Sequence, residues 1–187
     1  MSFITQVTIS IVIYFITRIS LKGKNSLNIA SGIAALSYAV MYLYAYDFIN
    51  ILPTIHFMVT GFSLIFIFIS YNEIIILERK VRKIKKGELI SNEPFSVEKS
   101  YKIVFKLLGL GLICLSLALV SGFSMQSIFT ANIIFKSIFT IIAWMIYVIT
   151  LIGIKFFNFP IKYATRSLFV AMWAVLIAYF MNSYIVG

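Results

Sequence analysis

The 187-residue chain has very few of the residues from which catalytic and metal sites are built. It contains one cysteine, one histidine and six acidic residues. The lone Cys114 excludes an intramolecular disulfide and any Cys-x-x-Cys motif. With His56 as the one histidine, a single chain cannot build a metal site from several His and Cys ligands. No Ser/His/Asp set and no phosphate-binding glycine loop is present, so we expect no enzymatic activity.

Charged residues are also scarce, at 12% of the chain, whereas hydrophobic residues make up 61% and the mean hydropathy is +1.02. Soluble domains are about 45–50% apolar. A chain of this size cannot bury that much apolar surface in its own core, so the lipid bilayer must be its solvent. The composition predicts an all-α fold, a polytopic transmembrane helical bundle forming a single integral membrane domain over residues 1–187.

Apolar stretches of the length needed to cross a bilayer, roughly 20 residues, occur six times. The first begins at Phe3 without a basic region or cleavage site before it, so we expect a retained span and not a cleaved signal peptide. The predicted spans are Phe3–Leu21, Asn28–Phe48, Thr54–Leu77, Ile103–Phe123, Ile133–Ile154 and Arg166–Tyr184.

The basic residues predict the orientation of these spans. The run Glu78–Lys86 is the one dense charge cluster, and it opens a predicted basic cytoplasmic loop, 78–102, in which Pro94 prevents one unbroken helix. The odd-numbered links hold 15 of the 16 Lys and Arg residues, and Lys136 is the exception. The positive-inside rule then predicts a multi-pass protein of the bacterial inner (cytoplasmic) membrane with both termini outside.

The formal charge of +10 needs no nucleic acid to explain it. No soluble basic module with interleaved aromatic residues is present, so we expect no nucleic-acid partner. Cytoplasmic loops that face anionic lipid headgroups account for the excess.

His56 is predicted at the outer end of the third span, just after Pro53. An ionisable group near the membrane is a candidate functional residue, and neutral imidazole is a common metal ligand, including for haem iron. The alternative is an interfacial histidine that bonds to a backbone carbonyl. Lys136 is predicted on the same outer side, where its cation could pair with a propionate, a phosphate, a lipid headgroup or Asp47.

Trp144 and Trp173 are predicted near the middle of the membrane, where a tryptophan either packs in the bundle or lines a flat aromatic ligand. Met41, Met58 and Met181 lie towards the outer ends of their spans and could offer an axial sulfur, although methionine is more often a packing residue. Glu73 could act in a proton relay. The simpler expectation is that Glu73 lies at the interface and pairs with basic residues one or two turns further on, while Arg18 extends to the headgroups.

Several short motifs occur in a characteristic order. Ile55-His56 leads an apolar span with a basic tail, Glu98 precedes the fourth span, and a closing Ala178-Tyr-Phe180 follows later. Between them stand Leu117-Ala-Leu-Val-Ser-Gly122, similar to Leu-Thr-x-Leu-Leu-Thr-Gly, and Lys136-Ser-Ile-Phe-Thr-Ile-Ile-Ala-Trp144, similar to His-Lys-x-x-x-Ser-x-x-Ala-Trp. From about Ile55 onwards the chain resembles the cytochrome c assembly family of membrane proteins, in its HemX/YpjD-like branch, with fewer N-terminal spans than relatives usually have.

This resemblance implies haem handling at the outer face and a role in cytochrome complex assembly. It implies haem as cofactor, with His56 as the iron ligand and Lys136 and Trp144 as further haem-binding residues. Because Phe135 stands where many relatives have a histidine, the second axial ligand would be a methionine, a group from another subunit, or absent. Other cytochrome-assembly membrane proteins, or further copies of the chain, are the expected partners beside haem and the bilayer. The alternative function is a non-enzymatic scaffold or small permease-like bundle that binds no haem.

Overall fold

The computed structural model describes residues 3–21, 25–45, 51–87, 97–125, 131–157 and 160–185, with side chains undescribed at 97–100, 131–133 and 179–185. Each regular element in these ranges is an α-helix. All six helices are long and apolar enough to cross a membrane, which confirms the predicted all-α bundle. They are α1 (Phe3–Ser20), α2 (Ser26–Ala45), α3 (Ile51–Lys85), α4 (Val97–Ser124), α5 (Ala131–Phe156) and α6 (Ile161–Ile185).

The helices differ from the predicted spans mainly where prolines and charges stand. Helix α3 begins before Pro53, because proline is tolerated in the first helical turn. Helix α6 begins directly after Pro160, whose carbonyl accepts the amide of Tyr163 at 2.9 Å. The predicted basic loop 78–102 is helical at both ends, since α3 continues to Lys85 and α4 begins at Val97. Charge ends a membrane span without ending the helix.

A glycine ends the long helix α3. Gly87 has a φ of 73°, a left-handed conformation that residues with a side chain rarely adopt. Its amide bonds to the Ile84 carbonyl at 3.0 Å, which satisfies one of the free carbonyls of the last turn. The 35 residues of α3 span about 52 Å at 1.5 Å per residue, more than the hydrocarbon core of roughly 30 Å. Part of α3 therefore projects from the membrane or crosses it at a tilt.

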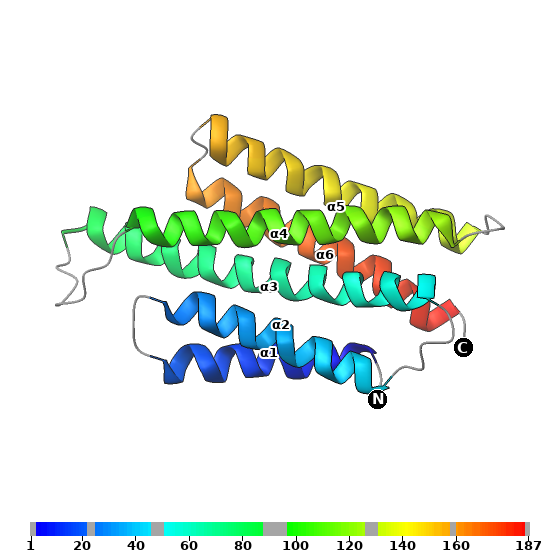
Figure 1. Cartoon of the computed structure of the whole chain (residues 1–187). Helices are drawn as coiled ribbons and strands as arrows, with labels where there is room; N and C mark the ends of the chain where they lie inside the picture. Colours follow the sequence, from blue (N-terminus) through cyan, green and yellow to red (C-terminus); the bar gives the residue numbers. More distant parts are fainter. Residues whose placement is uncertain are drawn as a thin grey trace.

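Helix α3 organises the bundle. It packs along α4 and also contacts α6, α1 and α2, whereas α5 packs on α6 and α4. The α1–α2 hairpin lies along one side of α3, and the α5–α6 hairpin lies on the other side of the α3–α4 pair (Figure 1).

Two apolar clusters fill the bundle. One joins α3 to α4, α5 and α6 around Ile67, Leu108 and Tyr147, and the other joins the α1–α2 hairpin to α3 around Ala34, Tyr38 and Ile65. Hydrogen bonds cross both clusters. Tyr38 and Tyr42 are fully buried and donate to the carbonyls of Phe57 and Thr54 in α3 at 3.1 and 2.9 Å.

The predicted separation of charge agrees with the arrangement of the helices. The end of α1, the end of α3, the start of α4 and the α5–α6 turn lie at one end of the bundle, and the chain termini lie at the other (Figure 1). Among the residues with described side chains, every Lys and Arg except Lys136 belongs to the first end, which we call the basic end. The structure does not contain a membrane, so the side on which each end lies stays a prediction.

Candidate functional site

A cavity of about 330 Å³ opens towards the end of the bundle opposite the basic end. It brings together His56, near the start of α3, and Lys136, near the start of α5. The sequence predicted both residues for one haem site, and the fold places them on one cavity. Its other lining residues are Phe57, Thr60, Ser63, Leu64, Leu115, Ala118, Leu119, Gly122, Phe123, Met125, Ser137, Thr140, Val175 and Ala178.

His56 is held by the neighbouring helix α4. Its Nδ1 lies 2.9 Å from Ser121 Oγ, and that hydroxyl also lies 2.8 Å from the Leu117 carbonyl, to which it donates. Because the Ser121 hydroxyl donates its proton to the Leu117 carbonyl oxygen, Ser121 Oγ accepts a hydrogen bond from Nδ1–H of His56. This tautomer leaves the lone pair of the imidazole on Nε2. The alternative predicted from the sequence was a bond to a backbone carbonyl, and the imidazole does bond to the Ala118 backbone of α4 as well as to the Ser121 side chain.

The imidazole has little room to turn. A Cβ atom on Gly122 would lie 3.1 Å from His56 Cε1, closer than such atoms normally approach. Phe57 also stacks edge-on to the ring, with centroids 5.5 Å apart. Glycine at position 122 therefore lets α4 approach the imidazole, and the close contact fixes its orientation.

Two hydroxyl groups of the cavity donate within their own helices. Thr60 donates to the His56 carbonyl at 2.7 Å, and Thr140 donates to the Lys136 carbonyl at 2.8 Å. Their oxygens can still accept a hydrogen bond from a ligand. Polar specificity in the cavity thus rests on one imidazole, one ammonium and a few acceptor oxygens within an apolar wall, the usual composition of a small-molecule site.

The methionine in this cavity is not one of the three that the sequence suggested. Met125, directly after α4, lines the cavity with His56. Met58 packs instead into the cluster with the α1–α2 hairpin, Met41 belongs to α2, and the side chain of Met181 lies outside the described residues. Asp47, suggested as a partner for Lys136, also lies outside them.

Trp144 does not line the cavity among the described residues. Its indole Nε1 donates to Ser116 Oγ on α4 at 2.8 Å, and the ring packs against the cluster of α3, α4, α5 and α6. This agrees with the packing alternative and not with contact to a flat ligand. Trp173 is half exposed on α6 and stacks edge-on with Phe169.

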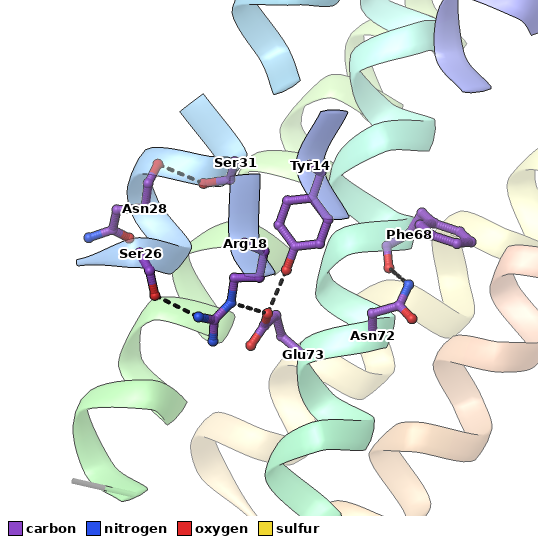
Figure 2. Close-up of polar contacts among 8 residues, drawn as sticks. All are labelled: Tyr14, Arg18, Ser26, Asn28, Ser31, Phe68, Asn72 and Glu73. Atoms are coloured by element: carbon purple, nitrogen blue, oxygen red, sulfur yellow. Dashed lines mark hydrogen bonds and ion pairs between the residues drawn. The ribbon is translucent and has the colours of Figure 1, made fainter. Parts of the chain in front are cut away.

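Glu73 forms a second polar site, and here the simpler sequence expectation is wrong. The carboxylate is buried, and its partner is Arg18 of α1, with Nε 2.9 Å from Oε1 (Figure 2). The Tyr14 hydroxyl donates to the same oxygen at 2.5 Å, and Arg18 also donates to Ser26 Oγ at 2.6 Å. Helix–helix packing brings Arg18 to α3, so the cluster fastens the α1–α2 hairpin to α3.

The chemistry available at the cavity follows from its donor atoms. Among the described residues no three His, Cys, Asp or Glu side chains come together, so a bare metal ion would not find three ligands of these types there. Haem iron carries four porphyrin nitrogens and needs only axial ligands from the protein. The donor set of His56 and Met125 therefore fits haem better than a free ion, and a cavity of 330 Å³ is at the small end of the usual 300–1,000 Å³ range for ligand sites.

Comparison with known proteins does not identify a family for the chain. No family model, no curated protein and no solved structure matches the chain.

Proposed function

We propose that the chain is an integral membrane protein of cytochrome c assembly that binds or passes haem at the end of the bundle opposite the basic end. The observation that carries the proposal is the cavity shared by His56 and Lys136. Haem bound there would supply an iron centre and two propionates. His56 Nε2 would ligate the iron, and the Lys136 ammonium would pair with a propionate.

The order of motifs along the chain supports the assembly role, and the donor atoms support haem. Ser121 supports ligation in particular, because metal-binding histidines usually donate their second ring N–H to a fixed acceptor. Met125 could supply a second axial ligand or leave the position to a partner protein. Trp144, bonded to Ser116, supports the fold of α4 and α5 in this proposal and not haem contact.

The proposal includes an orientation. We place the bundle in a bacterial cytoplasmic membrane, with the basic end in the cytoplasm and both termini outside, because cytoplasmic segments carry the excess of Lys and Arg. Haem would then meet the protein on the outer face.

Haemin titration of the purified protein in detergent tests the proposal. The wild-type protein is expected to shift and sharpen the Soret band with one equivalent of haemin. His56→Ala is expected to abolish the shift, because it removes the one imidazole of the chain. Reduction with dithionite should then give the spectrum of a histidine-ligated haem in the wild type alone.

Trp144→Phe is the matched control, since Trp144 is an aromatic residue of α5 outside the cavity lining. It is expected to titrate like the wild type. A wild-type protein that gives no spectral shift would contradict haem binding and favour the scaffold or permease-like alternative. Equal spectra for wild type and His56→Ala would contradict ligation by His56.

Ser121→Ala tests the orientation of the imidazole. Losing the hydrogen-bond partner of Nδ1 is expected to weaken haem binding by roughly 10–100-fold, the range for residues that orient metal ligands. Ser121→Thr keeps the hydroxyl and should restore most of the affinity. A Ser121→Ala protein that binds haem as tightly as wild type would show that the Ser121 contact does not position His56.

A further inference from the structure

Four exposed cations stand at one depth of the basic end. A small apolar crevice between α3, α4, α5 and α6 marks this position along the bundle axis. Its lining includes Leu77, Tyr101, Ile154 and Ile161. A hydrogen bond of 2.9 Å from Thr165 to Glu78 joins α6 to α3 next to it. Four exposed cations directly follow Tyr101, Ile154, Ile161 and Thr165 in sequence, and they are Lys102, Lys155, Lys162 and Arg166. Lys106, which follows the lining residue Phe105, lies one turn further along α4.

Exposed aromatic residues occur at the same depth. Phe156, Phe157 and Tyr163 are 67%, 72% and 57% exposed, and they flank the α5–α6 turn. Aromatic side chains gather at the membrane–water interface, where their rings meet the headgroups. Lys155 Nζ lies 5.2 Å from the centroid of the Phe156 ring. We therefore expect the four cations, which we call the interfacial cations, to lie at the depth of the lipid phosphates.

The interfacial cations have no acidic partner within the described part of the chain. At this end Glu73 is paired with Arg18, and Glu78 accepts the Thr165 hydroxyl. None of the four forms an ion pair with a described residue. Four exposed positive charges from three helices thus stand next to residues that line an apolar crevice or adjoin it. This is the pattern by which basic pockets between transmembrane helices recognise anionic lipid headgroups.

A second group of basic residues, at the end of α3, lies further from the apolar part of the bundle and provides a comparison for the interfacial cations. Arg82, Lys83, Lys85 and Lys86 are exposed and follow Leu77 by five to nine residues, roughly 8–14 Å at 1.5 Å per residue. In Figure 1 the α3–α4 pair extends further at this end than the other helices. A headgroup layer is roughly 5–8 Å thick. These four, which we call the distal cations, stand mostly beyond it.

We propose that the interfacial cations form a binding surface for the phosphates of anionic phospholipids. The acyl chains would lie along the exposed apolar faces of α4, α5 and α6, and the headgroup phosphate would meet Lys102, Lys162 or Arg166. Anionic headgroups are preferred over zwitterionic ones, because the latter carry their own ammonium group against the surface. The proposal is independent of haem binding, since it concerns the opposite end of the bundle.

Electron spin resonance with spin-labelled lipids tests this proposal on the full chain in phosphatidylcholine vesicles. The fraction of motionally restricted label gives the association of phosphatidylglycerol relative to phosphatidylcholine. The wild type is expected to favour phosphatidylglycerol by roughly fivefold, the ratio that one surface cation supplies. The interfacial variant K102Q/K155Q/K162Q/R166Q is expected to reduce this ratio to near one.

The distal variant R82Q/K83Q/K85Q/K86Q removes the same charge and is expected to keep the wild-type ratio. K102R/K155R/K162R/R166K keeps the charge and should also behave like wild type, which separates charge from fold. A wild-type ratio of one would overturn the proposal. So would an equal loss in the interfacial and distal variants, which indicates a diffuse electrostatic field, or a loss in the distal variant alone, which locates the lipid contact at the distal cations.

Discussion

Arg18→Met is expected to lower the free energy of unfolding by about 3 kcal/mol. The change leaves the buried Glu73 carboxylate without its cation, and breaking a buried ion pair from one side costs roughly 3–5 kcal/mol. We choose the lower figure because the Arg18 side chain is 29% exposed, so water compensates part of the loss. Reversible unfolding in mixed micelles, followed by helical circular dichroism, measures the difference.

The double variant Arg18→Met with Glu73→Met is the informative control. It removes both charges, so no uncompensated carboxylate remains, and apolar residues often replace buried ion pairs at little cost. We expect it to lie within about 1 kcal/mol of the wild type, the cost of leaving the Tyr14 hydroxyl without its acceptor. If the double variant were as unstable as Arg18→Met, the loss would come from packing and not from the stranded charge.

Gly61→Ala is expected to lower stability by about 2 kcal/mol. A methyl group at this position of α3 would overlap the hydroxyl end of the Tyr38 ring. Tyr38 is fully buried and donates to the Phe57 carbonyl, so the ring cannot move aside without losing that bond. Overpacking of this kind typically costs about 1–3 kcal/mol. The same micelle unfolding experiment gives the value.

Gly32→Ala in α2 and Gly109→Ala in α4 are the matched controls. Nothing lies within 4 Å of a methyl group added at either position. Both are expected to raise stability by about 0.5–1 kcal/mol, because alanine restricts the unfolded chain more than glycine does. A Gly61→Ala protein as stable as these two would show that α2 and α3 do not meet through Tyr38.

Much of the fold was predictable because membrane spans are set by one-dimensional properties. Hydropathy located the six helices, and the basic residues indicated which helix ends lie together. The same logic placed His56 and Lys136 at one end, although they belong to α3 and α5. Their meeting on one cavity depends on the order of the helices around the bundle, which hydropathy does not encode.

The side-chain partners were less predictable because they depend on how each helix is rotated. The packing of α4 on α3 brings Met125 to the cavity wall and Ser121 to the His56 imidazole. The sequence indicated neither contact. We expected Glu73 to pair with nearby basic residues because the sequence shows only how far apart two residues are along the chain. Its partner Arg18 lies 55 residues earlier and reaches it through the α1–α3 contact.

The link between Arg18 and Glu73 sets an order of events during biosynthesis. The arginine leaves the ribosome 55 residues before its carboxylate, a delay of about 3 to 11 s at ordinary elongation rates. Throughout that interval the first hairpin must enter the lipid with a guanidinium that only water, lipid phosphate or Ser26 can solvate. Once α3 is complete, Glu73 can pair with Arg18, so we expect the α1–α2 hairpin to be held stably in the bundle only after α3 has been inserted.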